Sequence, residues 1–226
     1  MKILSTKKLT PEQRNILHDF EVEEVSMIEI SYGENFKIEE NVENAVFTSA
    51  NSVRSVFSKH KNNTNWFNKV FCVGQKTKYL LEQAGLEVEV IANNALELAD
   101  VLVERFSNDE SSIKEISWFC GNLRNNDLPQ IMAEYGVLVT EYLVYQTNLI
   151  PVKLETEFDG VLFFSPSGIK SYLKKNPTNS KPVFCIGATT ATEAIHSFDN
   201  VYIADDTSVE SVLEKVKEVL ESYENE

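Results

Sequence analysis

The segment VFCVGQKT, residues 70–77, is repeated further along the chain as VFCIGATT, residues 183–190. Each copy is a short apolar run that ends in glycine and continues into residues typical of a helix start. This is the pattern of a buried parallel strand that leads into a helix. The alignment of the copies extends without a gap to Leu96-Glu97, opposite Val209-Glu210. The repeat therefore predicts two similar units, each a small parallel sheet with helices.

Two further segments repeat in the same order. AVFTSANSV at residues 45–53 aligns with VLFFSPSGI at residues 161–169, and a weaker echo places Val25-Ser26 opposite Val139-Thr140. Chance produces one short match easily but rarely several at nearly the same offset, so we interpret the pattern as an internal duplication. The alternative is one larger sheet whose two halves look alike.

Short β-rich runs alternate with amphipathic windows along the chain, which predicts parallel sheets covered by helices on both faces. The predicted strands are Met1–Ser5, Val25–Ser31, Ala45–Thr48, Lys69–Val73, Glu87–Ile91, Glu115–Cys120, Val137–Tyr145, Gly160–Phe164, Pro182–Ile186 and Asn200–Ala204. The predicted helices are Pro11–Phe20, Asn51–His60, Thr77–Ala84, Ala95–Phe106, Thr190–Ser197 and Ser208–Ser222.

Composition limits the classes of function. The chain has 226 residues with 42% apolar and 25% charged residues, enough to bury a core in one large or two small domains. A net charge of −14 argues against nucleic acid and anionic membranes as partners. No apolar run approaches the roughly 20 residues that cross a bilayer. The N-terminal apolar stretch is only Ile3-Leu4, too short for a signal peptide, so we expect a cytoplasmic protein. No long apolar surface stretch stands out, so we expect a monomer.

The sulfur and imidazole side chains do not suggest a metal or a nucleophile. The cysteines lie singly in apolar runs and form no CxxC, which is typical of reduced structural thiols: Cys72, Cys120 and Cys185. The histidines are scattered without metal-ligand spacing: His18, His60 and His196. We therefore expect neither a metal nor an organic cofactor.

Four turns between a predicted strand and a predicted helix are rich in Ser, Thr and small residues. In open α/β sheets ligands bind beyond the carboxyl ends of strands, where helix N-termini offer N–H groups to anions. Ordinary helix capping is the alternative at each turn. The candidate anion-binding residues are Thr48, Ser49 and Asn51; Gln75, Lys76 and Thr77; Ser165, Pro166, Ser167 and Gly168; and Ala188, Thr189 and Thr190.

A fifth turn and the strand after it add further candidates. Gly121 and Asn122 suit a strand-to-helix turn, and Arg124 is a basic residue near the predicted ligand edge, where a solvated arginine is the alternative. Tyr142 and Tyr145 lie three apart in the next predicted strand, so we expect their side chains on opposite faces.

Taken together, CGNLR at residues 120–124 and VYQT at residues 144–147 resemble the uroporphyrinogen-III synthase family. Supporting matches are FTS at residues 47–49, FFSPSG at 163–168 and IGATTA at 186–191, in the family's order. Two positions depart from its pattern, because Lys76 replaces a small residue and Asp199-Asn200 stand where the family usually has glycine.

The resemblance implies two flavodoxin-like lobes joined by a two-stranded hinge, with the active site in the cleft between them. One lobe would combine residues 1–31 with 148–226, and the other would span residues 36–143. The hinge would comprise residues 32–35 and 144–147. Val25–Ser31 and Val139–Tyr145 would be the crossing strands.

The family's reaction, by resemblance, is a cofactor-free dehydration of hydroxymethylbilane, a linear tetrapyrrole with eight carboxylates. The enzyme is a carbon–oxygen lyase of porphyrin and heme biosynthesis that inverts the last pyrrole ring and closes the macrocycle as uroporphyrinogen III. Its substrate would come from hydroxymethylbilane synthase by a transient handover. The family's tyrosine in VYQT maps onto Tyr145, which the resemblance implies as the proton donor. Tyr142, on the other face, would be its control.

The acidic chain must then bind an anionic substrate. We expect local attraction from backbone N–H groups, Lys76 and Arg124, and acidic residues placed elsewhere, many of them in Glu214–Glu226. The alternative functions are a non-catalytic two-lobed protein that binds an anion or a tetrapyrrole, and a degenerate, regulatory family member. A flavodoxin-like electron carrier fits less well because of the duplication.

Overall fold

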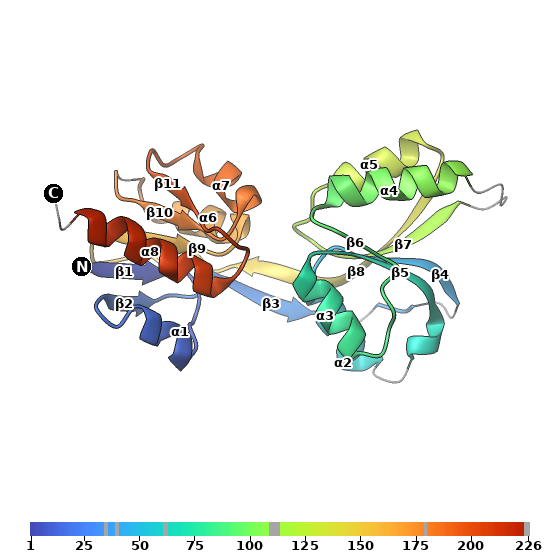
Figure 1. Ribbon diagram of the computed structural model, residues 1–226, viewed down its shortest axis with the longest axis horizontal. Coiled ribbons are helices and arrows are strands. Elements are labelled where there is room, and N and C mark those ends of the chain that lie inside the picture. The colour runs from blue at the N-terminus through green and yellow to red at the C-terminus, as the bar shows by residue number, and fades with distance from the viewer. Residues whose placement is uncertain (34–35, 39–40, 61–62, 109–113, 179, 224–226) are drawn as a thin grey trace. The chain divides into compact units, whose positions relative to one another are not determined.

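The computed structural model describes residues 1–33, 36–38, 41–60, 63–108, 114–178 and 180–223 (Figure 1). It divides into two compact units. Unit 1 comprises Met1–Glu29 with Asn148–Glu226, and unit 2 comprises Ile30–Thr147. Residues 34–35 of the expected hinge and residues 224–226 of the acidic C-terminal stretch lie outside the described residues.

Unit 1 is built on a five-stranded sheet in the order β11-β10-β9-β1-β2, and its neighbouring strands pair in parallel. The strands are β1 (Lys2–Ser5), β2 (Glu21–Glu24), β9 (Gly160–Phe163), β10 (Val183–Cys185) and β11 (Val201–Ile203). The helices are α1 (Pro11–Ile16), α6 (Pro166–Leu173), α7 (Ala188–Ala194) and α8 (Val209–Tyr223).

Both faces of the unit 1 sheet are buried, because side chains alternate between the faces of a strand. Ile3 packs with Val212 and Leu213 of α8, whereas the adjacent Leu4 packs with Ile169 of α6 and Ala191 of α7. Strands buried on both faces must be apolar throughout, which is why short continuous apolar runs marked them in the sequence.

Unit 2 carries a six-stranded sheet in the order β3-β8-β7-β4-β5-β6. The strands are β3 (Ile28–Tyr32), β4 (Val42–Phe47), β5 (Phe67–Val73), β6 (Val90–Ala92), β7 (Glu115–Gly121) and β8 (Leu138–Leu149). The helices are α2 (Ala50–Lys59), the 3-10 turn η1 (Thr64–Trp66), α3 (Gln75–Gln83), α4 (Ala95–Asn108) and α5 (Asp127–Glu134). Neighbouring strands among β6, β5, β4, β7 and β8 pair in parallel. Helices α2 and α3 cover one face of the sheet, and α4 and α5 cover the other (Figure 1).

Strand β3 is the exception, because it runs antiparallel to β8. Gly33 N–H donates to the Val144 carbonyl at 2.7 Å, and Ile150 N–H donates to the Met27 carbonyl at 2.8 Å. Residue numbers therefore rise along one strand as they fall along the other. The chain passes from one unit to the other within β3, at Glu29–Ile30, and within β8, at Thr147–Asn148.

The two sheets have the same layout. The order β11-β10-β9-β1-β2 in unit 1 corresponds strand by strand to β6-β5-β4-β7-β8 in unit 2. The repeated segments fall on equivalent elements, since β4-α2 matches β9-α6 and β5-α3 matches β10-α7. The predicted fold class, parallel sheets flanked by helices, is confirmed. The alternative of one large sheet is wrong, because the structure has two sheets.

The prediction of one strand over Val25–Ser31 was wrong. The chain forms β2 over Glu21–Glu24, leaves the ladder, and forms β3 over Ile28–Tyr32. Three of the four β2 residues are glutamates, which an edge strand tolerates because one side of it is open to water. Lys2 pairs with Glu23 at 2.9 Å and Arg14 pairs with Glu24 at 2.7 Å.

The weak echo was misaligned for the same reason. The ladders open with Lys2 opposite Glu21 in unit 1 and Glu115 opposite Leu138 in unit 2. Val139 therefore corresponds to Val22 rather than to Val25. The duplication is nevertheless complete, because β1-α1-β2 and β7-α5-β8 occupy equivalent places.

Candidate functional site

The carboxyl ends of three central strands of unit 2 lie side by side. Phe47 of β4 is paired with Cys72 of β5 on one side and with Phe119 of β7 on the other. The turns that follow these strands therefore share one edge of the sheet. Connections from β4 and β7 lead to opposite faces, and ligands of open α/β sheets bind at such a switch point.

The turn after β4 is held by side-chain hydrogen bonds. The indole Nε1–H of Trp118 donates to Thr48 Oγ1 at 3.0 Å. Ser49 is the N-cap of α2, and its Oγ accepts from Asn51 N–H at 3.2 Å. The Asn51 side chain accepts from Arg54 at 3.4 Å. Capping occurs as the alternative interpretation expected, but it leaves the Ser49 hydroxyl proton available to a second partner.

The turn after β5 depends on Gly74, whose φ of 82° is in the left-handed region that favours glycine. No side chain caps the N-terminus of α3. Gln75 and Lys76 are exposed there, whereas the Thr77 side chain is 4% exposed and belongs to the core. The uncapped helix start and the Lys76 ammonium suit an anion.

Tyr145 lies directly against the turn after β7. A Cβ added to Gly121 would lie 2.4 Å from Tyr145 Cζ and 2.8 Å from Tyr145 Oη, so only glycine fits beneath this ring. Ser49, at the start of α2, acts on the same phenol, since its hydroxyl favours a lower pKa of Tyr145. The sequence predictions Ser49, Gly121 and Tyr145, which come from three elements, thus meet at one place.

The surroundings keep this phenol protonated. Burial raises the pKa of Tyr145 above its ordinary value of 10, the Ser49 hydroxyl opposes that shift, and the nearby Cys120 adds to it. A buried group of this kind is a proton donor rather than a base at neutral pH.

The expectation that Tyr142 and Tyr145 face opposite sides was wrong. Cys120 is paired with Leu143, but Gly121 is paired with Tyr145, so Val144 is an extra residue in β8. This bulge returns Tyr145 to the face occupied by Tyr142. Both rings pack on the α2/α3 core, and Tyr142 stacks on Phe119 with ring centroids 4.9 Å apart.

Asn122 and Arg124 are engaged with the protein. Asn122 Oδ1 accepts from Thr147 N–H at 2.7 Å, and its Nδ2 donates to the Thr147 carbonyl at 3.3 Å. Asn122 thereby clamps the VYQT segment. Arg124 pairs with Glu141, and its guanidinium carbon lies 5.7 Å from the Trp118 ring centroid. Arg124 Nε is buried without a hydrogen-bond partner among the described residues.

The predicted turns of unit 1 are also neighbours, since β9 and β10 pair with Phe163 opposite Cys185. Ser165 is the N-cap of α6 and its Oγ accepts from Gly168 N–H at 3.1 Å, while Pro166 occupies the first turn. Ser165 Oγ and Ser167 Oγ lie 3.0 Å apart. At the start of α7, Ala188 and Thr189 are exposed, whereas the Thr190 side chain is only 3% exposed.

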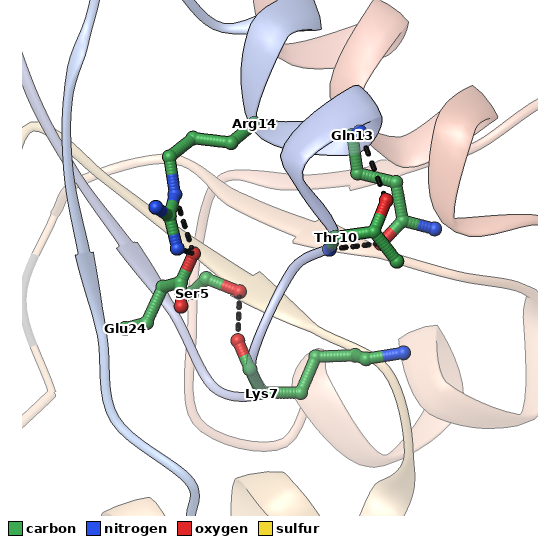
Figure 2. Close-up of polar contacts among 6 residues, drawn as sticks. All are labelled: Ser5, Lys7, Thr10, Gln13, Arg14 and Glu24. Carbon is green, nitrogen blue, oxygen red and sulfur yellow. Dashed lines mark hydrogen bonds and ion pairs between the residues drawn. The ribbon is translucent and has the colours of Figure 1, made fainter.

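The turn after β1 was missed in the sequence. It borders the Ser165 turn, because β1 pairs with β9. Figure 2 shows that Ser5 Oγ donates to the Lys7 carbonyl at 2.7 Å and that Thr10 and Gln13 form a capping box at the start of α1. Lys7 Nζ lies 5.3 Å from the Phe164 ring centroid. The signal was available, because Thr6-Lys7-Lys8 directly follow a predicted strand.

Charge is distributed unevenly around each sheet. The turns that lead from β1, β4, β5, β6, β7, β9 and β10 into helices contain no Asp or Glu. Only the turn after β11 contains carboxylates, Asp205 and Asp206, and Asp205 pairs with Lys215 at 3.1 Å. Acidic residues do stand in the first turns of α1, α4 and α5, whereas the first turns of α2, α3, α6 and α7 have none. The starts of these last four helices are therefore favourable for anions despite the net charge of −14.

Metal and membrane features were also sought in the part of the chain that the structure describes. It contains no group of three His, Cys, Asp or Glu side chains that could hold a metal ion. Within the same residues, no helix is long and apolar enough to cross a bilayer.

Solved structures share the fold. A uroporphyrinogen-III synthetase from Helicobacter pylori 26695 aligns with a TM-score of 0.68 and 19% identity, covering 96% of this chain and 99% of that chain. A mutant uroporphyrinogen III synthase from the extremely thermophilic bacterium Thermus thermophilus aligns with a TM-score of 0.73 and 13% identity, covering 98% and 99%. At these identities the likeness establishes the fold.

Sequence comparisons add the family. An uncharacterized protein of Rickettsia prowazekii (strain Madrid E) is 29% identical over 142 residues, which are 63% of this chain and 46% of that protein. The chain thus matches less than half the length of this curated relative. The family model described as "Uroporphyrinogen-III synthase HemD" matches residues 16–214. The chain therefore belongs to the uroporphyrinogen-III synthase family.

Proposed function

We propose that this protein is a uroporphyrinogen-III synthase, a lyase that dehydrates hydroxymethylbilane and closes it into uroporphyrinogen III with inversion of the last pyrrole ring. One observation carries the proposal beyond family membership. Tyr145, a phenol whose pKa burial raises, lies on Gly121 at the switch point of the unit 2 sheet. This supports Tyr145 as the proton donor, because α/β proteins bind ligands at such an edge.

Substrate binding is assigned to the carboxyl edges. The eight carboxylates of hydroxymethylbilane need donors, and the starts of α2, α3, α6 and α7 supply backbone N–H groups that carry the positive end of the helix dipole. Lys76 adds an exposed ammonium in unit 2, and Lys8 adds one in unit 1. The buried Thr77 and Thr190 side chains would contribute by shaping these turns.

Tyr145 acts at the dehydration step. Its O–H donates a proton to the leaving hydroxyl oxygen while the C–O bond breaks, water departs, and the adjacent pyrrole nitrogen supplies the electron pair that forms an azafulvene. The substituted carbon of the last ring attacks this electrophile to form a spiro intermediate, which fragments and recloses. The proton lost when the ring regains aromaticity restores the phenol, so the net change is loss of one water.

The phenol is a weak acid, so its contribution is modest. A positioned general acid typically supplies a factor of roughly 10² to 10⁴ in rate. The electron-rich pyrrole assists C–O cleavage, and the larger task is to hold the two ends of a flexible chain together. That task falls to the anion-binding turns, because orientation lowers the entropic part of the barrier.

The test is a coupled assay with freshly generated hydroxymethylbilane, with the type I and type III isomers separated by chromatography. Uncatalysed closure gives isomer I, so isomer III above background reports catalysis. Tyr145→Phe should lower its rate by roughly 10² or more.

Tyr142→Phe is the matched control, because it removes a hydroxyl from the same face of the same strand and keeps the ring that stacks on Phe119. It should retain isomer III formation. Isomer I alone from folded wild-type protein would overturn the proposed function and favour a non-catalytic role.

A further inference from the structure

We propose that Ser55 and Gly33 are positioning residues for Tyr145: together they hold the carbonyl of the bulge residue Val144, which fixes the phenol over Gly121. The inference deepens the proposed function and rests on it, since it concerns how the proposed proton donor is aimed. Neither residue lies in a turn assigned to substrate.

The Val144 carbonyl receives two donors from two other elements. Ser55 Oγ–H of α2 donates to it, and so does the backbone N–H of Gly33, at 2.7 Å. Ser55 and Val144 are both 0% exposed, so water does not compete for this carbonyl. A buried carbonyl without a partner would cost free energy, so the two donors stabilise β8 at the bulge.

The bulge decides where Tyr145 points. If β8 stayed in register with β7 beyond Leu143, Val144 would be paired with Gly121 and Tyr145 with Asn122. Successive residues alternate between the faces of a strand, so the Tyr145 ring would then lie on the α4/α5 face. Because Val144 is the extra residue, Gly121 pairs with Tyr145 instead, and the ring lies on the α2/α3 face near Ser49.

Gly33 lies so close to this carbonyl that a side chain at residue 33 would not fit without a shift. A Cβ at Gly33 would lie 2.8 Å from the Val144 oxygen and 3.2 Å from Phe36 Cδ1. Any side chain there would push the carbonyl away from its place. Residue 33 must therefore be glycine for its N–H to reach the Val144 carbonyl in this geometry.

The internal repeat provides a natural comparison. Ser171 in α6 corresponds to Ser55 in α2, and it is also 0% exposed. In unit 1 the pairing of β1 with β2 is regular from Lys2 to Ser5, and Ser171 Oγ has no hydrogen-bond partner among the described residues. The buried serine occurs in both units but holds a bulge only in the unit that carries Tyr145.

The experiment measures the tyrosine itself as well as the rate. The protein is labelled with ¹³Cζ-tyrosine, the Tyr145 resonance is assigned with Tyr145→Phe, and its titration is followed by NMR in wild type, Ser55→Ala and Gly33→Ala. Ser171→Ala is the matched control, because it removes a buried hydroxyl from the equivalent helix position. Thermal unfolding shows that each variant is folded.

If the proposal is right, Ser55→Ala releases the bulge and the phenol leaves its buried place. Its pKa then falls toward the ordinary value of about 10, because burial is the main cause that raises it. The rate constant kcat should fall by about 10- to 100-fold with KM within about twofold, since the proton donor is misplaced while the anion-binding turns are intact. Gly33→Ala should give the same signature, and Ser171→Ala should give wild-type values.

An unchanged Tyr145 chemical shift and titration in Ser55→Ala would overturn the proposal, whatever happens to kcat. The same holds if Ser171→Ala shifts the Tyr145 titration as much as Ser55→Ala does. These outcomes differ from failure of the proposed function, which shows as folded wild-type protein forming isomer I alone. They also differ from failure of the Tyr145 role, which shows as Tyr145→Phe forming isomer III at the wild-type rate. The NMR titration reports the position of the phenol in either case.

Discussion

Gly121 lies directly beneath the Tyr145 ring, so close that a Cβ on residue 121 would be 2.4 Å from Tyr145 Cζ. Contacts between carbon atoms need about 3.5 Å or more, so either the ring or the strand end would have to move. The glycine of CGNLR and the tyrosine of VYQT are therefore one structural unit, although 24 positions separate them in the sequence.

Gly121→Ala should cost stability only while the ring of Tyr145 is present. In a double-mutant cycle, Gly121→Ala should lower the free energy of unfolding in wild type and much less in Tyr145→Val, where the space above residue 121 is open. Neighbours that share space typically show coupling of about 0.5–3 kcal/mol. Urea unfolding of the four proteins gives the coupling directly, and strictly additive effects would contradict the contact.

The Arg124–Glu141 ion pair predicts an activated variant. Arg124 is the arginine expected to meet a substrate carboxylate, but Glu141 occupies it, and the two side chains are 28% and 33% exposed. Glu141→Gln should free the guanidinium and lower KM about two- to fivefold, the equivalent of roughly 0.5–1 kcal/mol. Stability should change by less than about 1 kcal/mol, because exposed ion pairs contribute little.

Arg124→Gln shows whether Glu141→Gln acts by freeing Arg124 or only by removing a negative charge. It should raise KM, and combining it with Glu141→Gln should abolish the gain from the glutamate change. A gain that persists without Arg124 would show that Glu141 acts by repelling the substrate directly.

The repeat shows how much of this fold the sequence can predict. Parallel strands buried on both faces must be apolar throughout, so VFCVG and VFCIG were visible, and their glycines marked the turns. β2 was invisible because glutamates fill it. It is held by its backbone pairing with β1 and by ion pairs with Lys2 and Arg14, and none of these contacts leaves a local pattern.

The site shows the same limit at a finer scale. Tyr145 could be found through VYQT, but its direction could not, because Leu143-Val144-Tyr145 has the pattern of an uninterrupted strand. The extra residue at Val144 depends on donors from Ser55 and Gly33, 89 and 111 positions away. The pairing of Arg124 with Glu141 is likewise a product of the β7–β8 register.

The three thiols should be inert in the folded protein. Burial raises the pKa of Cys72 and of Cys120 to about 11 and that of Cys185 to about 12, and the residues are at most 1% exposed. Ellman's reagent at pH 8 should find no rapidly reacting thiol in native protein and three in urea. A fast native phase would show that a strand opens and would revive a reactive-cysteine role.

The same pKa shifts predict alkaline destabilisation. The folded-state pKa values lie above those of the unfolded chain, so the native state binds more protons between them. This contribution to stability is fully present below about pH 8.5 and is lost as pH rises through about 11 and 12. Tyr145 and Tyr172, whose pKa values burial also raises, act in the same direction. Urea midpoints should be flat from about pH 7 to 8 and fall above about pH 9; a rise with pH would contradict burial as the cause.

Salt should accelerate the proposed reaction at low substrate concentration. A chain with a net charge of −14 repels an octa-anionic tetrapyrrole at long range, whereas the carboxylate-free turns attract it at contact. The Debye length shrinks from about 30 Å at 0.01 M salt to about 8 Å at 0.15 M, so added salt removes the long-range repulsion before it weakens contacts of a few ångströms. Initial rates should therefore show kcat/KM rising over this range while kcat stays constant.

If kcat/KM falls instead, the basic groups at the turns govern the encounter with the substrate as well as the contact. Lys8→Gln tests whether contact at the unit 1 edge limits binding. If it does, this variant should have a lower kcat/KM than wild type at every salt concentration.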